Sequence, residues 1–229
     1  MFTNTRLRVL NVKKKVMVFG TGGHAVSAAS LAEQCGFSVS FFVSLQETLD
    51  KINGKQIRGI QSFPSGSKIA IVIAVGDNYV RENVTEQLTT LAKRKRIEIA
   101  FPNLIHPSCH IGSNATFGQG NQLFPGANIG AHSRIDDFVI LNHLSSLDHE
   151  SSMESFASLA PSAVTGGRVK IGRRSALLIN SAVSNGIEIG SDAIIAANSF
   201  VKEDVMNNSL VAGSPARFIR HHRAGDSYL

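Results

Sequence analysis

The chain has 229 residues, of which 43% are hydrophobic and 17% charged, so it can bury a core in one large domain or two modest ones. No apolar run approaches the ~20 residues of a membrane-spanning helix, and the basic start has neither the apolar length nor the small-residue cleavage site of a signal peptide. These features exclude a membrane protein and predict a cytoplasmic one.

The net charge of +6 is typical of proteins that bind phosphate-bearing partners. Much of the excess lies near the two ends, in "VKKKV" and "RFIRHHR", and no basic stripe interleaved with aromatic residues crosses the body of the chain. We therefore do not expect a nucleic-acid partner. The two cysteines, Cys35 and Cys109, lie in segments of different character, so no disulfide framework is predicted.

Residues 1–102 alternate between strand-like and helix-like segments. Apolar runs predict four strands, and segments with helical spacing predict two helices; the strands are 15–20, 37–43, 68–76 and 97–101, and the helices 25–36 and 78–95. This alternation predicts a parallel, Rossmann-like α/β sheet. Ligands bind such sheets beyond the carboxyl ends of the strands, where residues 20–24 and 76–78 lie.

The first strand ends in the turn "GTGGHA", which opens a helix. It matches the dinucleotide fingerprint only partly, because Ala25 stands at the third glycine position. Its main-chain N–H groups and helix dipole suit a phosphate, although a tight turn without a ligand would have the same sequence. The second strand ends without the acidic residue that would hold a ribose hydroxyl, which argues against an NAD site.

From residue 105 the chain follows a period of six. Large apolar residues occupy sixteen of the seventeen positions spaced by six from Ile105 to Val201, the exception being Thr165, and mostly small residues stand two positions earlier. This is the hexapeptide repeat of a parallel β-helix, whose aliphatic residues point inward and whose three hexads form one coil. The pattern predicts a second domain over residues 103–229, with five to six coils and a C-terminal tail.

The repeat contains one acid–base cluster, Asp148, His149 and Glu150, just past the inward Leu147. The residues 18 positions from His149, Ala131 and Gly167, have almost no side chain, so the histidine is expected in open space. A neighbouring carboxylate fixes the tautomer of an imidazole and raises its basicity, which suits a general base near neutral pH. A surface histidine without a role is the alternative.

The chain as a whole resembles the sugar acyltransferases that include sialic-acid O-acetyltransferases and the N-acetyltransferases of bacillosamine and perosamine synthesis. The resemblance rests on motifs spread over residues 16–220, namely "VFGTGGHA", "AVGDN", "LIHPSCHIG", "LDHE", "GGRVKIG", "LINSAV" and "VAGSPAR". It implies a Rossmann-like domain that binds a nucleotide sugar, then a left-handed β-helix. It also implies a homotrimer, with acetyl-CoA between two β-helices. Closed symmetry would cover the long sides that a lone β-helix exposes.

The resemblance also implies roles for individual residues. The catalytic base would be His149, tuned by Glu150. Substrate-binding positions would be Gly22, Gly23, His24, Gly76, Asn78 and Asn142; acetyl-CoA contacts would be Gly167, Ile179 and Ala197. Two places depart from the family pattern: Ser158 replaces a histidine that contacts the thioester arm, and Ser44 and Leu45 replace paired aspartates that reach the nucleotide.

These observations predict direct transfer of an acetyl group from acetyl-CoA to a nucleotide-linked amino sugar in a ternary complex. O-acetylation of a sialic-type sugar is the nearest alternative. A zinc lyase of the carbonic anhydrase type needs a close pair of histidines and a third one or two coils away, whereas His143 and His149 fall on different sides of the coil. We therefore expect no metal. A binding module with a purely structural repeat is the remaining alternative.

Overall fold

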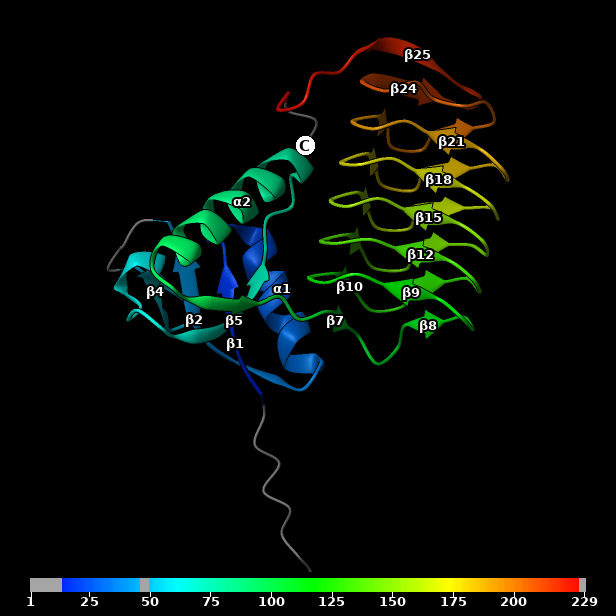
Figure 1. Cartoon of the computed structure of the whole chain (residues 1–229). Helices are drawn as coiled ribbons and strands as arrows, with labels where there is room; N and C mark the ends of the chain where they lie inside the picture. Colours follow the sequence, from blue (N-terminus) through cyan, green and yellow to red (C-terminus); the bar gives the residue numbers. More distant parts are fainter. Residues whose placement is uncertain (1–13, 46–49, 227–229) are drawn as a thin grey trace, which may run out of the picture.

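The computed structural model describes residues 14–45 and 50–226. An α/β domain and a long triangular prism lie side by side, joined by the segment between Ala100 and Leu104 (Figure 1). The expected domain boundary at residues 102/103 falls in this segment. Residues 1–13 of the first expected domain and 227–229 of the tail lie outside the described residues.

The α/β domain is built on a six-stranded sheet in the order β3-β4-β2-β1-β5-β6. All neighbouring strands are parallel except the β3–β4 hairpin. The strands are β1 (Lys14–Phe19), β2 (Phe37–Ser44), β3 (Lys51–Ile52), β4 (Lys55–Gly59), β5 (Lys68–Ile73) and β6 (Glu98–Ala100); the helices are α1 (Gly23–Gln34), α2 (Asn78–Arg94) and the 3₁₀ helix η1 (Ile60–Ser62).

The four predicted strands and both predicted helices are confirmed. The central strands are buried because β-branched residues such as Val16, Val18 and Ile71 face the core, and the buried face of α1 is mostly alanine, which allows a helix to lie close to a sheet. The hairpin β3–β4 and η1 were not predicted, because only Ile57 and Ile60 of this short segment are buried large hydrophobics.

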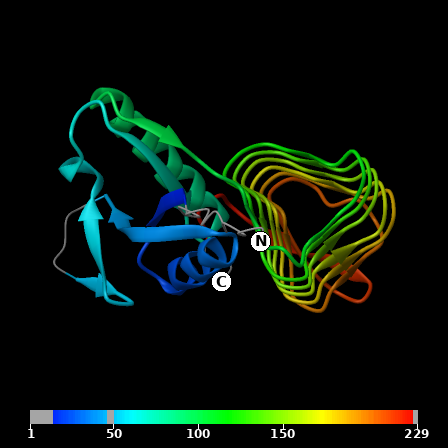
Figure 2. The same cartoon turned by 90° about the horizontal axis from the view of Figure 1, so that it is seen from below.

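Residues 104–213 form a left-handed parallel β-helix with three sheets. The first sheet faces the α/β domain and contains β7 (Leu104–Ile105), β10 (Gln122–Leu123), β13 (Ile140–Leu141), β16 (Ser158–Leu159), β19 (Ala176–Leu177), β22 (Ile194–Ile195) and β24 (Ser209–Gly213), then antiparallel β25 (Ala216–His221). Seen along its axis, the prism is a stack of rounded triangles (Figure 2).

The other two sheets complete each coil. The second contains β8 (His110–Ile111), β11 (Asn128–Ile129), β14 (Ser146–Leu147), β17 (Val164–Thr165), β20 (Ala182–Val183) and β23 (Phe200–Val201). The third contains β9 (Thr116–Phe117), β12 (Arg134–Ile135), β15 (Ser152–Met153), β18 (Lys170–Ile171) and β21 (Glu188–Ile189). We call the turns from first to second sheet the first corner, from second to third the second corner, and from third to first the third corner.

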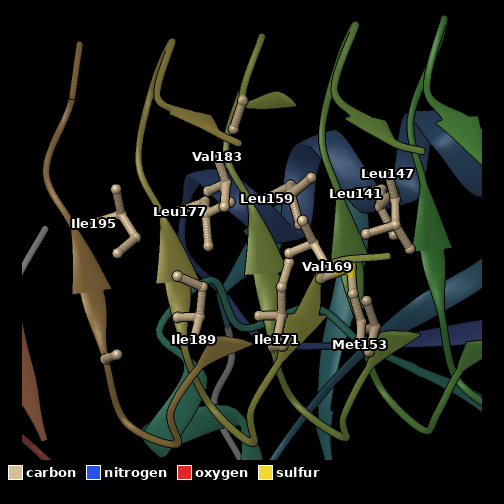
Figure 3. Packing of buried hydrophobic residues seen from close by; sticks show 14 of the residues in the cluster. Leu141, Leu147, Met153, Leu159, Val169, Ile171, Leu177, Val183, Ile189 and Ile195 are labelled. Atoms are coloured by element: carbon tan, nitrogen blue, oxygen red, sulfur yellow. The ribbon is translucent and has the colours of Figure 1, made fainter. Parts of the chain in front are cut away.

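The predicted inward residues form the core of the prism. From Leu123 to Val201 every hexad's inward side chain is at most 7% exposed, and these side chains stack along the axis (Figure 3). At the open end, Ile111 is 37% exposed, because no coil lies below it. The spacing of six therefore predicted the core, and only the end of the stack departs from it.

Each corner turns through a residue with positive φ. These residues recur every six positions from Asn114 to Asn198, and most are not glycine; they include His132 (φ 60°), Leu144 (φ 58°), Glu150 (φ 55°) and Arg168 (φ 57°). The left-handed conformation costs a non-glycine residue about 1 kcal/mol. The repeated main-chain bonding of the coils holds these residues in it.

Arg81 of α2 fastens the α/β domain to the third corner. Its guanidinium is fully buried and donates to the carbonyls of Phe138 and Phe156 on two coils, and to those of Val75 and Gly76. One residue on, Glu82 pairs with two arginines of the prism, Arg173 and Arg174. Because Arg81 bonds Gly76 and the prism together, it also fixes the distance between them.

The hairpin β24–β25 closes the far end of the prism, after which the chain returns to the start of α2, where Gly225 lies against Tyr79 (Figure 1). None of the helices in residues 14–45 and 50–226 combines the length and hydrophobicity needed to cross a bilayer.

Candidate functional site

His149 lies at the second corner, on a turn between β14 and β15. Its ring Nδ1 is 3.1 Å from Oε2 of Glu150, and both side chains are about half exposed. A carboxylate accepts hydrogen bonds only, so Nδ1 carries the hydrogen and Nε2 is left as the basic nitrogen. Asp148 does not touch the ring; its Oδ1 accepts from the main-chain N–H of His149 at 2.7 Å. Glu150 is therefore the tautomer-fixing carboxylate.

The space beside the ring depends on Gly167, one coil further along the axis. A methyl group on Gly167 would lie 2.4 Å from Nε2 of His149, closer than any non-bonded contact allows. On the opposite side, a methyl group on Gly130 would lie 2.3 Å from the main-chain nitrogen of His149. The expectation that small residues leave His149 open is confirmed by its exposure and by Gly167.

Side chains inside the prism hold the His149 turn in place. Thr165, the exception in the apolar series, accepts a hydrogen bond from the N–H of Asp148 at 3.1 Å through its hydroxyl. Ser133 donates to the carbonyl of Asp148, and Ser151 lies 3.3 Å from that of His149. The one polar inward residue of the repeat thus lies directly beneath the acid–base cluster, which the sequence pattern alone did not explain.

A second feature is a cavity of about 470 Å³ between the α/β domain and the first sheet. Six predicted site residues line it: His24 and Gly76 from the α/β domain, and Asn142, Ser158, Ile179 and Ala197 from the prism. Its other lining residues are mostly apolar and were not predicted: Ile140, Leu159, Ala160, Pro161 and Leu178. Ile140 lies on the outer face of the first sheet, Leu159 is an inward residue of the same sheet, and the other three lie at the first corner.

His24 forms the inner wall of this cavity. Its Nε2 lies 3.2 Å from Oε1 of Gln122, and its ring lies 5.8 Å from that of Phe124. Burial, and secondarily the positive charge of Arg81, lower the pKa of His24 to about 4. His24 is therefore neutral at physiological pH and meets a ligand as an uncharged hydrogen-bonding group.

Asn142 is oriented by its neighbour His143. Its Oδ1 lies 2.7 Å from Nδ1 of His143 and accepts from the N–H of the same residue. The amide nitrogen of Asn142 is then the group available to the cavity, where it can donate. His143 packs on Phe124 with ring centroids 5.1 Å apart, as expected of a residue that fills the corner, but it also sets the direction of Asn142.

Asn78 is placed differently from the expectation. It is only 1% exposed, and its Nδ2 lies within 3.1 Å of Oγ of Ser158 and the carbonyls of Arg174 and Ser175. This burial leaves no surface for direct contact with a ligand. Asn78 instead holds the hydroxyl of Ser158 at the cavity wall.

Gly22 and Gly23 lie outside the cavity, at the start of α1. No side chain caps this helix, and a methyl group on either glycine would meet nothing within 4 Å. Gly20 is the glycine that the fold itself requires, because its φ is +128° and a methyl group there would lie 2.6 Å from the carbonyl oxygen of Ala74. The open N–H groups of this turn remain suited to a phosphate.

The predicted residues therefore form two groups. His149, Glu150 and Gly167 lie at the second corner, whereas His24, Gly76, Asn142, Ser158, Ile179 and Ala197 lie around the cavity. The second sheet separates them within one chain. Among the described residues, no three His, Cys, Asp or Glu side chains are arranged to hold a metal ion.

Residues 15–88 match the family model of the PglD N-terminal domain. The whole structure resembles a variant of perosamine N-acetyltransferase from Caulobacter crescentus, solved with CoA and GDP-perosamine, with a TM-score of 0.80 and 26% identity over 90% of this chain and 97% of that one. The acetyltransferase domain of PglB from Neisseria gonorrhoeae, solved with acetyl coenzyme A, gives a TM-score of 0.79 and 28% identity over 90% and 100% of the two chains.

A similarity of another kind covers part of the chain. Serine acetyltransferase 2 of Arabidopsis thaliana is 32% identical over 139 residues, which is 60% of this chain and 38% of that protein. The chain thus spans well under half the length of this curated relative.

Proposed function

We propose that this chain is a PglD-like sugar acetyltransferase, which transfers the acetyl group of acetyl-CoA to the amino group of a nucleotide-linked sugar; the match of residues 15–88 to the PglD N-terminal domain and the likeness of the structure to two sugar acetyltransferases support it. The observation that carries the proposal is the pairing of a carboxylate-held, half-exposed His149 with a separate cavity lined by the family's substrate positions. The proposed location is the cytoplasm, consistent with two free cysteines.

The two groups of residues require a second copy of the chain. His149 and the cavity are separated by one side of the prism, on the order of 15 Å of backbone. General-base catalysis requires hydrogen-bond contact between the base and the reacting group. A closed trimer, in which the second corner of one copy faces the cavity of the next, would bring the two groups together.

The exposed surface supports such an assembly. Beyond the open end of the prism, the exposed large apolar side chains on the described part of the second sheet and the adjoining first corner are Leu144, Val164, Ile179 and Phe200, with exposed fractions between 39% and 66%. Large apolar side chains exposed on one side of a protein favour an interaction site there. The band lies between the cavity and His149, where the proposed neighbour would pack.

The first corner has the shape to hold an extended acyl carrier. Pro161, Ile179 and Ala197 stand 18 residues apart and line the cavity on three successive coils, spaced by roughly 5 Å each. An apolar groove of this length suits the pantetheine arm of acetyl-CoA. Ser158, in place of the family's histidine, offers a hydroxyl held by Asn78.

The α/β domain would bind the nucleotide sugar. The uncapped start of α1 offers N–H groups to its phosphates. Ser44 ends β2, and Leu45 follows it; neither is the aspartate that reaches the nucleotide in the family. We therefore expect a nucleotide contact that differs from the usual one. Residues 46–49, next in the chain, lie outside the described residues.

The proposed chemistry needs no protein nucleophile, because the thioester is already activated. Nε2 of His149 removes a proton as the sugar nitrogen attacks the thioester carbonyl. The tetrahedral intermediate then collapses, the C–S bond breaks, and coenzyme A leaves as the thiol after taking up a proton. Glu150 stabilises the imidazolium through Nδ1–H. Main-chain N–H groups of the neighbouring copy are the proposed donors to the oxyanion.

The test is release of coenzyme A from acetyl-CoA with a panel of nucleotide-linked amino sugars. We expect turnover with at least one, and a loss of about a hundredfold or more in kcat for His149→Ala, because general-base assistance is worth ~10²–10⁴. Binding of acetyl-CoA should be unchanged. His106→Ala, which removes a histidine from the first coil, is the matched control. Wild-type turnover by His149→Ala would exclude this role.

The same panel decides between nitrogen and oxygen acceptors. O-acetylation of a sialic-type sugar needs the same base, so the His149 variant does not separate the two reactions. Neutral nucleotide sugars and free sialic-type sugars, offered beside the amino sugars, do. Release of coenzyme A with these acceptors alone would make the protein an O-acetyltransferase.

A further inference from the structure

Gln122 is a buried polar residue of β10 that neither the sequence motifs nor the proposed mechanism includes. It is 1% exposed, although it lies on the outer face of the first sheet, because the α/β domain covers it. Its amide nitrogen donates to the carbonyl of Ile73, at the end of β5, at 2.8 Å. Most buried side-chain amides have hydrogen-bond partners, so the partners of Gln122 indicate how its amide is oriented.

The bond to Ile73 fixes which way the amide points. A carbonyl oxygen only accepts, so the NH₂ group of Gln122 must face Ile73 and Oε1 must face His24. Oε1 lies 3.2 Å from Nε2 of His24. Since Oε1 also only accepts, Nε2 must carry the hydrogen. Neutral imidazole has one hydrogen, so Nδ1 of His24 is an acceptor.

Nδ1 of His24 is free to meet a ligand. None of the hydrogen bonds among the described residues involves it, and it is not one of their buried side-chain polar atoms that lack a partner, so solvent reaches it. Because His24 lines the cavity, we take Nδ1 to be the ring nitrogen that a ligand in the cavity can reach.

We infer that Gln122 is a positioning residue that fixes the tautomer of His24, so that Nδ1 accepts a hydrogen bond from a donor group of a bound substrate. The inference deepens the proposed function and rests on it for the identity of the substrates. Two sources offer such a donor: a hydroxyl or amine of the acceptor sugar, and an amide N–H of the pantetheine arm. Asn142, which also lines the cavity, offers a donor. The cavity wall therefore presents one hydrogen-bond acceptor, Nδ1 of His24, and one donor, the amide nitrogen of Asn142.

The surroundings keep His24 neutral. Beside the effect of burial, Arg81 is the charged group that lowers its pKa, Gln122 is its hydrogen-bond partner, and its ring lies 5.8 Å from that of Phe124. With the pKa of His24 lowered to about 4, Nδ1 stays an acceptor throughout the physiological range. The acceptor role therefore depends on Gln122 for the tautomer and on burial for the charge state.

The experiment combines ¹⁵N NMR of histidine-labelled protein, assigned with His24→Phe, with steady-state kinetics of Gln122→Met. Wild-type His24 should show hydrogen on Nε2. The methionine variant should lose this preference and raise one KM about tenfold, the effect of one lost hydrogen bond, with kcat within about threefold. An increase in KM for the sugar identifies the sugar donor; an increase in KM for acetyl-CoA identifies the pantetheine amide. Gln119→Met, exposed on the third corner, is the control.

The conservative variant Gln122→Glu distinguishes a residue that positions His24 from one that only stabilises the fold. Its carboxylate still accepts from Nε2, so the tautomer should be restored, but the negative charge should raise the pKa of His24 above its wild-type value. His24 then gains a hydrogen on Nδ1 as the pH falls, so the same KM should rise between pH 8 and pH 6, unlike that of the wild type.

Unchanged hydrogen placement in Gln122→Met, or two unchanged KM values, would overturn the inference. The NMR measurement needs no turnover. A coenzyme A release assay that stays silent with every acceptor would therefore count against the proposed function and leave the Gln122–His24 pair to be judged by its spectrum.

Discussion

At the scale of single residues, the second corner brings together groups that each serve His149. Glu150 fixes its tautomer, Gly167 leaves room for its ring, and Thr165 supports its turn from inside the prism. Each of these three positions departs from what packing alone would favour. A carboxylate in a left-handed turn, a glycine without positive φ, and a hydroxyl in an apolar core are explained by the histidine that they surround.

Gly167→Ala should lower kcat strongly while the protein remains folded. The added methyl group would lie 2.4 Å from Nε2, so the ring must rotate away from its catalytic orientation; we expect a loss of tenfold to a hundredfold in kcat. The check is a double-mutant cycle with His149→Ala, measured as kcat. If the methyl group still lowered the residual rate tenfold in the absence of the imidazole, the effect would not act through His149.

Glu150→Gly should move stability and activity in opposite directions. Glycine relieves the left-handed conformation at φ 55°, so the free energy of unfolding should rise by about 0.5–1 kcal/mol. The rate should fall, because the imidazole loses its carboxylate. Denaturant unfolding and kcat measure the two effects. The control is Asn114→Gly, at φ 59° on the same corner of the first coil, which should stabilise the protein without lowering kcat. A Glu150→Gly variant less stable than the wild type would contradict this explanation of the turn.

At the scale of elements, α2 decides how the cavity is closed. The helix carries Asn78, Arg81 and Glu82 on one buried face, and each of them bonds to the prism. A helix whose buried face is polar is unusual, since hydrophobic surface normally fills that position. Here Asn78 and Arg81 donate to main-chain carbonyls at the third corner, and Glu82 accepts from the side chains of Arg173 and Arg174. The helix is therefore oriented by hydrogen-bond direction as well as by packing.

Arg81→Met should loosen the α/β domain from the prism. It removes the buried guanidinium and leaves the carbonyls of Phe138 and Phe156 without donors, so we expect a loss of about 3 kcal/mol in the free energy of unfolding. The cavity should lose its Gly76 wall, and KM for both substrates should rise. Arg168→Met, exposed at the second corner, is the stability control. Equal thermal midpoints for the two variants would refute the anchoring role.

At the scale of the whole molecule, one chain contains both halves of the proposed site but does not join them. The cavity lies at the first corner and His149 at the second, with an exposed apolar band between them. In a ring of three copies, the apolar band of each copy would pack against the next copy, and the three interfaces would form three sites. Activity would then depend on the assembly as much as on any residue.

Mixed assemblies should restore activity between two inactive variants. His149→Ala lacks the base, and Ala197→Trp fills the cavity, so neither works alone. In randomly mixed trimers, a site that takes its base from one copy and its cavity from the next is intact in about a quarter of cases. Coexpression followed by the coenzyme A release assay measures this. No recovery in mixed trimers confirmed by sedimentation would place both halves of the site in one chain.

The sequence by itself determined the architecture, because a hexapeptide spacing is a local rule: each inward residue from Leu123 to Val201 needs only its own coil and its neighbours to be buried. It also predicted the pairing of His149 with Glu150, because the two residues are adjacent in the chain. The tertiary structure alone decided the wall of the cavity, the buried role of Asn78, and the tautomer of His24 through Gln122. These contacts join residues about 80 to 98 positions apart, one in the α/β domain and one in the prism. A repeat in the sequence predicts contacts within the prism, but it does not predict which side chains meet where the α/β domain packs against it.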